Sequence, residues 1–341
     1  MTPSEVDDKD CYFRYYADVY VHLELIKDKS RMDAYKSAVA FHSDFIEGKV
    51  VLDVGCGTGI LSILCAKAGA RKVYAVDASE IALQAQSIVK DNNLSDIITV
   101  LHGRVEDVTI DEQVDVIISE WMGYMLLQEC MLESIVTARD RWLKPSGLLL
   151  PSSATVNSLR NYFILPLPSC TWLHSPALRY FDNIGFWSDV DGIDMSALIP
   201  LAKKDAFSTP SVETIRSESI LGKAHQVKKI DIYSVSNPEL ESVTSKFMFK
   251  SYISAPLHGF VFWFETEFSQ KKPKHSGVPS PILSTAPEVL IDCDDLIQLE
   301  KGQTIEGSVT ITQNDMKQRF LVIRLQYASG GESYVKVVSF L

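Results

Sequence analysis

The chain has 341 residues, of which 46% are hydrophobic and 23% are charged, and this composition predicts a soluble globular protein of about two domains of ~150 residues. Its formal net charge of −11 argues against nonspecific binding to nucleic-acid backbones, which requires clustered Lys and Arg. The N-terminus, MTPSEVDDKD, lacks the apolar stretch of a signal peptide, and the strongest apolar run, residues 259–264, is too short to span a membrane. We therefore expect that the protein neither associates with a membrane nor binds nucleic acid directly.

The cysteines are scattered along the chain and predict neither a disulfide framework nor a metal site. No pair has CxxC spacing, and no Cys/His cluster suggests zinc. Reduced thiols indicate a cytoplasmic and/or nuclear protein. The six cysteines are Cys11, Cys56, Cys65, Cys130, Cys170 and Cys293.

The first half of the chain predicts helices followed by an α/β domain. Residues 11–47 carry apolar and aromatic side chains at helical spacing. From 48 to 151, short apolar strands alternate with helices, and the helix at 79–93 is expected to have Ser79 as its N-cap. Such alternation is typical of a Rossmann-like parallel sheet covered on both faces. The expected strands are 50–55, 72–77, 97–103, 114–120 and 148–151.

The second half, residues 152–341, predicts an antiparallel β-sandwich or β-barrel. Its segments are rich in β-branched and aromatic residues, mostly alternating with polar ones. A mixed, partly helical insertion at about 187–215 interrupts this pattern. The expected strands are 228–235, 246–255, 259–268, 304–313, 319–328 and 333–340.

A glycine-rich turn, VVLDVGCGTGIL, follows the first expected strand. Gly55, Gly57 and Gly59 would let the backbone approach a ligand closely. The dinucleotide fingerprint GxGxxG requires a third glycine at position 60, and Ile60 stands there. The turn therefore disfavours NAD.

Two acidic residues near this turn favour another nucleoside ligand. Asp53 precedes the glycines, where it would repel a pyrophosphate. Asp77 ends the second strand, where a carboxylate can accept hydrogen bonds from both ribose hydroxyls; the alternative interpretation is an acid at the entry to a helix. An adenosyl ribose joined to a cationic amino acid satisfies both positions. The sequence thus predicts S-adenosylmethionine as cofactor, with S-adenosylhomocysteine as its product.

The stretch VDVIISEWMGYMLLQE, residues 114–129, places Glu120 and Glu129 among apolar residues. They could be surface acids at the ends of a loop, or they could hold a cation. Because ligands bind at the carboxyl ends of parallel strands, their position favours a cation site.

These motifs together resemble the protein arginine methyltransferase family over nearly the whole chain. The matching segments are YFRYY (12–16), HLELIKDKSR (22–31), VLDVGCGTGIL (51–61), SEWMGYMLLQE (119–129), GLLLPSSATV (147–156) and FWSDVDGIDMS (186–196). The resemblance is to type I, nuclear-type members, and it implies a Rossmann-like domain followed by a β-barrel with a dimerisation arm. It further implies a homodimer that forms monomethyl- and asymmetric dimethylarginine on histone tails or Arg/Gly-rich proteins.

The resemblance assigns five further residues to the cofactor site. Arg31 should pair with the methionine carboxylate, bidentately as its planar guanidinium allows. His22 should lie beside the cofactor, and Tyr16 should cover it. Glu106 and the Val105 backbone should contact the adenine.

By the same resemblance, Glu120 and Glu129 are catalytic and hold the substrate guanidinium from two sides. A guanidinium is always protonated and is a poor nucleophile, so a site for it must neutralise its charge and orient one nitrogen. Met122 and Met131 should line the substrate pocket, and Met131 should restrict the room around the methylated nitrogen.

The chain departs from the family pattern in three places. Most members carry a Thr-His-Trp triplet whose His pairs with an acid equivalent to Asp28, but residues 282–301 contain neither His nor Trp, and His258 lies in an expected strand. Asp77 replaces the usual Glu, and Leu25 replaces the Met common in type I members.

Two alternative functions remain open from the sequence. The missing triplet leaves the possibility of a noncatalytic, S-adenosylmethionine-binding dimeric module. A nucleic-acid methyltransferase is less favoured, because SEWM stands where base methyltransferases commonly have an (Asp/Asn)-Pro-Pro-Tyr motif.

Overall fold

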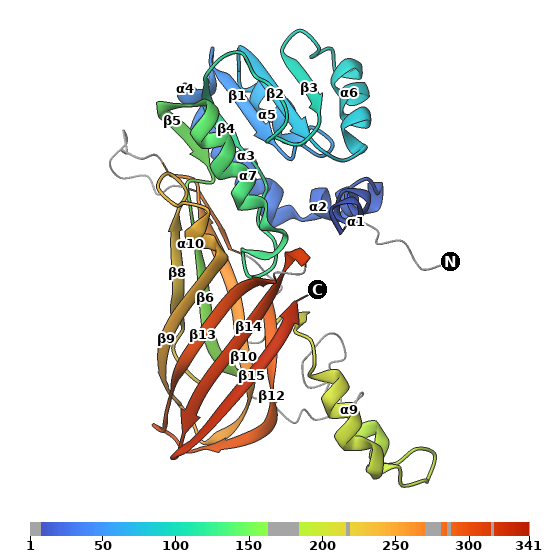
Figure 1. Cartoon of the computed structure of the whole chain (residues 1–341), viewed down its shortest axis with the longest axis vertical. Helices are drawn as coiled ribbons and strands as arrows, with labels where there is room; N and C mark the ends of the chain where they lie inside the picture. The colour runs from blue at the N-terminus through green and yellow to red at the C-terminus, as the bar shows by residue number, and fades with distance from the viewer. Residues whose placement is uncertain are drawn as a thin grey trace.

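The computed structural model describes residues 8–162, 184–215, 219–269, 281–284, 288–314 and 317–340. Figure 1 shows an α/β domain above a long β-barrel, with a helical arm that contains α9 at the lower right, beside the barrel. Parts of the expected barrel domain, 152–341, lie outside the described residues. In the described part, no helix is long and apolar enough to cross a membrane.

Four helices precede the sheet, as expected for residues 11–47. Asp18 caps α2 by accepting a hydrogen bond from Tyr20 N, and Asp28 caps α3 by accepting one from Arg31 N. α3 buries Tyr35 completely against the rest of the protein. The helices are α1 (Asp8–Tyr15), α2 (Val19–Lys27), α3 (Lys29–Phe41) and α4 (Ser43–Ile46).

The α/β domain contains the predicted parallel sheet, with strand order β3-β2-β1-β4-β5. The central strand β1 (Val50–Val54) is buried at every position, as its apolar sequence requires. Strand order reverses between β1 and β4, and at such a point the carboxyl ends of the strands leave a crevice for ligands. The other strands are β2 (Lys72–Asp77), β3 (Ile98–His102), β4 (Val114–Ile118) and β5 (Leu143–Leu150); the helices are α5 (Ile60–Lys67), α6 (Ile81–Asp91) and α7 (Met131–Trp142).

The prediction that Ser79 caps α6 was wrong. The N-cap is Glu80, without a capping side-chain hydrogen bond, and Ser79 Oγ instead donates to Asp77 Oδ1 at 2.7 Å. The serine hydroxyl thus donates to a carboxylate, which is a strong acceptor, and does not accept a hydrogen bond from the helix N–H groups. Ser79 therefore orients Asp77.

The C-terminal domain is antiparallel, as predicted, and consists of two sheets that enclose an aromatic core. One sheet has the order β7-β12-β10-β6-β8, with β11 beside β10, and the other has the order β15-β14-β13-β9. Phe260 lies between Phe247 and Tyr327, with ring centroids 5.9 and 4.9 Å away. The strands are β6 (Ser153–Tyr162), β7 (Ser211–Glu213), β8 (His225–Asp231), β9 (Ser242–Lys250), β10 (Ala255–Glu267), β11 (Ile282–Ser284), β12 (Glu288–Leu299), β13 (Thr304–Asn314), β14 (Lys317–Ser329) and β15 (Glu332–Phe340).

The insertion expected at 187–215 is partly helical. It contains α9 (Ile199–Ala206), and short 3-10 turns cover Gly185–Ser188 and Ser196–Leu198. Its last residues form β7, which pairs with β12 and so belongs to the barrel. A four-residue helix, α10 (Pro238–Glu241), precedes β9.

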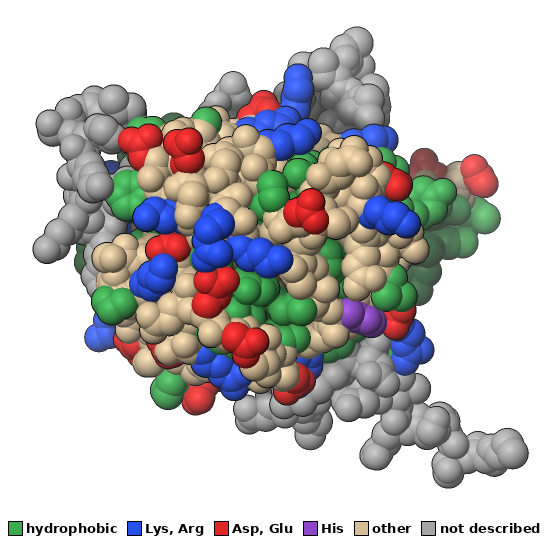
Figure 2. Space-filling model, turned by 90° about the horizontal axis from the view of Figure 1, so that it is seen from above, with side chains coloured by type: hydrophobic (Ala, Val, Ile, Leu, Met, Phe, Trp, Pro, Cys, Tyr) green, Lys and Arg blue, Asp and Glu red, His purple; other side chains and the backbone are tan. Residues whose placement is uncertain are grey.

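The face of the α/β domain that points away from the barrel carries interspersed basic and acidic side chains (Figure 2). No single sign of charge dominates this view. Such a face differs from the continuous basic surface by which proteins follow a nucleic-acid backbone.

Candidate active site

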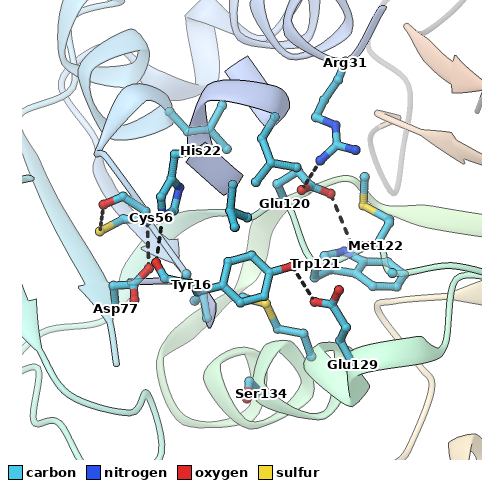
Figure 3. A pocket seen from close by; sticks show the side chains of 18 of the residues that line it. Tyr16, His22, Arg31, Cys56, Asp77, Glu120, Trp121, Met122, Glu129 and Ser134 are labelled. Carbon is cyan, nitrogen blue, oxygen red and sulfur yellow. Dashed lines mark hydrogen bonds and ion pairs between the residues drawn. The ribbon is translucent and has the colours of Figure 1, made fainter. Parts of the chain in front are cut away.

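A cavity of about 420 Å³ lies at the carboxyl ends of β1, β2 and β4, beneath α1 and α2. Figure 3 shows side chains from these elements converging on it. A volume of this order is typical of cofactor and substrate sites. The predicted residues that line it are Tyr16, His22, Arg31, Gly55, Gly57, Asp77, Val105, Glu106, Glu120, Met122, Glu129 and Met131.

The glycine turn requires its glycines. Gly55 and Gly57 have φ of +70° and +55°, values that other residues adopt at a cost. A Cβ on Gly55 would lie 2.2 Å from Met131 Cε, and one on Gly57 would lie 3.1 Å from the His22 ring. The turn therefore leaves backbone, rather than side chains, facing the cavity.

Asp77 is held in place beside this turn. Its Oδ2 accepts a hydrogen bond from Gly57 N, and its Oδ1 accepts from Ser79 N, both at 2.8 Å. A carboxylate has about four lone-pair positions, so capacity remains for a ribose hydroxyl. The shorter aspartate thus fits the predicted ribose role.

Asp53 is the one predicted site residue that does not line the cavity. Its carboxyl is fully buried behind the glycine turn, where Oδ2 accepts a hydrogen bond from Ser62 Oγ at 2.7 Å and Oδ1 has no partner among the described residues. Burial raises the pKa of Asp53 to about 7, against the lowering effect of Ser62. Asp53 can therefore act on a ligand only through charge or through the turn.

Two tyrosines from the N-terminal segment cover the cavity and bind Glu129. Tyr16 Oη and Tyr12 Oη donate to Glu129 Oε2 at 2.8 and 3.0 Å. His22 Nε2 lies 2.8 Å from the Tyr16 carbonyl oxygen and so fixes the turn between α1 and α2. Tyr12 was not among the predicted site residues, although its four-residue spacing from Tyr16 places both on one helix face.

Glu120 already holds a guanidinium. Arg31 Nη1 donates to Glu120 Oε2 at 2.6 Å, and Arg31 Nε lies 3.4 Å from Asp28 Oδ2. Asp28, whose usual histidine is missing, therefore has two uses: it caps α3 and it pairs with Arg31. Glu120 is also fixed by a hydrogen bond from Met122 N at 3.3 Å.

Their surroundings destabilise the ionised form of both glutamates and raise their pKa. Burial raises the pKa of Glu120, although the charge of Arg31 opposes this, and the charge of Glu129 adds to it. Burial also raises the pKa of Glu129, although hydrogen bonds from Tyr16 and Tyr12 oppose this. A second cation placed between the two carboxylates would stabilise their ionised forms and lower the pKa of both.

The loop that carries the glutamates is strained, and Arg319 of β14 holds it. The non-glycine residues with positive φ in this loop are Met125, Leu126, Glu129 and Cys130. Arg319 Nη1 donates to the Glu129 carbonyl oxygen at 2.6 Å, while its Cζ lies 3.7 Å from the centroid of the Tyr12 ring. Arg319 was not among the predicted site residues, because in the sequence it resembles any polar position of an alternating strand.

The residues expected at the adenine are firmly oriented. Ser134 Oγ of α7 donates to Glu106 Oε1 at 2.7 Å, and Arg104 Nε lies 3.3 Å from Glu106 Oε2. Val105 is buried beside them.

The segment without the Thr-His-Trp triplet forms the short strand β11 and the long strand β12. His258 lies in β10, as expected, and does not line the cavity; Leu25 does. The cavity wall on this side is formed by apolar residues of β10, β11 and β12.

Sequence comparison identifies relatives over nearly the full chain. Two family models match the chain. The model of the arginine methyltransferase oligomerization subdomain matches residues 174–332, and that of ribosomal protein L11 methyltransferase (PrmA) matches residues 39–162. Probable protein arginine N-methyltransferase 6 of Arabidopsis thaliana is 48% identical over 98% of this chain and 82% of its own length. Protein arginine N-methyltransferase 6 of Xenopus tropicalis is 37% identical, over 96% of this chain and 94% of its own.

Solved structures agree with this relationship. Arabidopsis thaliana protein arginine methyltransferase 10 superposes with a TM-score of 0.83 at 32% identity, covering 97% of this chain and 100% of that one. The Trypanosoma brucei PRMT1 enzyme-prozyme heterotetrameric complex with AdoHcy superposes with a TM-score of 0.81 at 31% identity, covering 96% and 99%. Fold, cavity and relatives lead to one conclusion: this chain belongs to the protein arginine N-methyltransferase family, enzymes that use S-adenosylmethionine to methylate arginine in proteins.

Proposed function

We propose that Glu120 and Glu129 bind the guanidinium of a substrate arginine from two sides and orient one terminal nitrogen for methylation. The observation that carries this proposal is the 2.6 Å ion pair between Glu120 and the Arg31 guanidinium, which supports it because the folded chain already holds this carboxylate against a guanidinium. Glu129 lines the same cavity with a raised pKa. Two such carboxylates match the charge and planar shape of an arginine side chain.

The residues around the glutamates fit the cofactor. The bare backbone at Gly55 and Gly57, the remaining acceptor capacity of Asp77 and the positive charge of Arg31 suit an adenosyl group joined to an amino acid. When bound, S-adenosylmethionine supplies the electrophilic methyl group and leaves as S-adenosylhomocysteine. Glu106 and Val105 would bind the adenine, and Asp77 the ribose.

The chain's own contribution is orientation and charge. Tyr12 and Tyr16 hold Glu129, while Met122 N and Arg31 hold Glu120, so both carboxylates are fixed before substrate enters. Fixed geometry of this kind can lower a barrier by as much as ~7–11 kcal/mol. Polarising the guanidinium toward the carboxylates leaves more electron density on the attacking nitrogen, and its proton can leave through a carboxylate or water. Because the two acids share a cavity, their titration belongs to the pair.

Peptide binding in the presence of S-adenosylhomocysteine tests the two-glutamate site. Isothermal titration should detect an arginine peptide and should find a much weaker interaction for the same peptide with lysine. Glu120→Gln should weaken arginine binding by about a hundredfold or more, since it leaves a buried charge unpaired. Glu133→Gln is a matched control, because Glu133 lies in α7, where it accepts a hydrogen bond from Gln313, and does not line the cavity. Equal loss in both variants would refute the assignment.

We further propose that the products are monomethyl- and asymmetric dimethylarginine, on histone tails or Arg/Gly-rich proteins. Met131 supports this, because its methyl group lies against Gly55 and limits the space on that side of the cavity. Basic substrates also suit a chain with a net charge of −11.

A homodimer is the proposed oligomeric state. The arm exposes Phe186, Ile193 and Leu201, each by more than half. The outer face of α1 and α2 exposes Tyr15, Val19, Tyr20, Leu23 and Ile26. Contact between the arm of one protomer and α1–α2 of the other would cover both apolar surfaces and would order the helices that close the cavity. Leu201→Asp should therefore lower both the solution mass and the activity, whereas Leu296→Asp, on an exposed position of β12, should change neither.

The proposed compartment is the cytoplasm and/or the nucleus. The cysteines that the structure describes, including Cys56 and Cys65, are free thiols, as a reducing compartment allows. Fluorescent tagging of the full chain in cells would test this.

The alternative of a noncatalytic module rested on the missing triplet. Asp28 nevertheless has partners in Arg31 and the α3 N-terminus, so loss of the histidine leaves no unpaired acid at that position. This observation favours the enzyme.

A further inference from the structure

On the side where β10, β11 and β12 contribute to it, the cavity is lined by apolar side chains. Phe262 and Phe264 of β10, Leu283 of β11 and Val289 of β12 line this part of the cavity, which we term the apolar chamber. All four side chains are buried. Trp263, half-buried, lines the cavity beside them.

Tyr35 lines the same cavity and connects the glutamate loop to the residue that follows β10. Its hydroxyl donates to the carbonyl oxygen of Ser119, the residue before Glu120, at 2.7 Å. Its ring packs edge-on against Phe268, just after β10, with centroids 5.0 Å apart. One fully buried side chain therefore fixes the backbone before Glu120 against the residue that follows β10.

The shortened segment accounts for the chamber. β12 pairs with β10 up to Val289 opposite Phe262, and β11 pairs with β10 from Ser284 opposite Glu265. Only residues 285–287 separate β11 from β12. The segment in which the family pattern has a polar triplet therefore contributes Leu283 and Val289 to the lining of the chamber.

An apolar wall selects apolar ligands. Water in such a space finds few hydrogen-bond partners, so a hydrocarbon group displaces it at little cost. A charged or amide side chain would lose its hydration without compensation. A group that enters beside a bound arginine must belong to the same substrate.

We propose that the apolar chamber binds an aliphatic side chain adjacent to the target arginine, so that this enzyme prefers arginine next to leucine-like residues over arginine flanked only by glycine. The inference rests on the proposed two-glutamate site and refines its substrate class. Burial of one aliphatic side chain corresponds to about a ten- to hundredfold gain in kcat/KM.

Three peptides of equal length and charge test the proposal with the full-length enzyme. They differ only around one arginine: Gly-Arg-Gly, Leu-Arg-Gly and Gly-Arg-Leu. At least one leucine peptide should exceed the glycine peptide about tenfold or more in kcat/KM. Equal kcat/KM values for all three peptides would overturn the proposed role of the chamber and would leave the two-glutamate site unaffected. No methylation of any peptide, with cofactor still bound, would overturn both.

A pair of matched variants locates the preference. Val289→Thr places a hydroxyl in the chamber and should reduce the leucine-to-glycine ratio about threefold to tenfold. Val261→Thr is the control, because Val261 is equally buried but packs with Leu290 in a separate cluster on the other side of the sheet. The ratio is unaffected by a misfolded fraction, which lowers both rates alike. A similar ratio in both variants would overturn the proposal.

Discussion

Arg319 should be needed for activity although it lies in the barrel, 190 residues from Glu129 in sequence. Its guanidinium stacks on Tyr12 and donates to the Glu129 carbonyl oxygen, so it joins β14, α1 and the strained loop. The residues around that hydrogen bond, Glu129 and Cys130, have φ of +71° and +55°. Such conformations persist only where neighbouring contacts hold them.

The size of the effect follows from the two contacts. A partly desolvated cation–π contact contributes about 0.5–2 kcal/mol, and a charge-assisted hydrogen bond about 1.5–3 kcal/mol. Arg319→Met removes both while keeping an unbranched side chain. A loss of ~2–4 kcal/mol from the active arrangement would lower kcat/KM by about thirty- to a thousandfold.

Initial rates with an arginine peptide measure this loss, and thermal unfolding separates it from instability. Arg319→Lys should fall between wild type and Arg319→Met, because it keeps the charge but not the planar hydrogen-bonding geometry. Arg324→Met, on an exposed position of the same strand, should match wild type. If Arg319→Met kept kcat/KM within about threefold of wild type at an unchanged melting temperature, Arg319 would not support the loop.

Three further predictions concern charge. Because the ionised glutamates bind arginine and burial raises the pKa of both, kcat/KM should decline with falling pH well above the usual glutamate range, and a flat profile down to about pH 5 would contradict this. Arg31→Lys should weaken S-adenosylmethionine binding about ten- to a hundredfold by calorimetry, since lysine cannot grip a carboxylate bidentately; unchanged affinity would remove Arg31 from the cofactor site. Burial raises the pKa of Asp53 to about 7, above its unfolded value of about 3.9, so this group costs stability as pH rises between these values. Asp53→Asn should flatten that part of the unfolding free-energy profile measured in denaturant, and an unaltered slope would show that Asp53 does not titrate there.

The sequence predicted what depends on local pattern. Fully apolar strands such as β1 and the glycine turn after it are local signals, and they placed Gly55, Gly57 and Asp77 correctly at one edge of the sheet. The antiparallel domain followed from alternation. β12 was not expected, because the acidic stretch DCDD at 292–295 interrupts its alternation, and the register of β12 against β10 shifts there.

Contacts between distant segments could not be predicted from the sequence. The ion pair of Arg31 with Glu120 and the contacts of Arg319 join residues far apart in the chain, and nothing in their local context distinguishes them from surface charges. Asp53 was placed in the cofactor site on the basis of its charge. Its side chain instead faces inward from β1, where it is buried and accepts a hydrogen bond from Ser62.

The most direct test of the two-glutamate site is mass spectrometry of an Arg/Gly-rich peptide after incubation with S-adenosylmethionine and either the wild-type enzyme or Glu129→Gln. We predict that the wild-type enzyme adds one and then two methyl groups, that fragment ions assign the second to the same nitrogen, and that the variant loses nearly all turnover. Wild-type levels of methylation by Glu129→Gln, with cofactor binding intact in both proteins, would contradict the account.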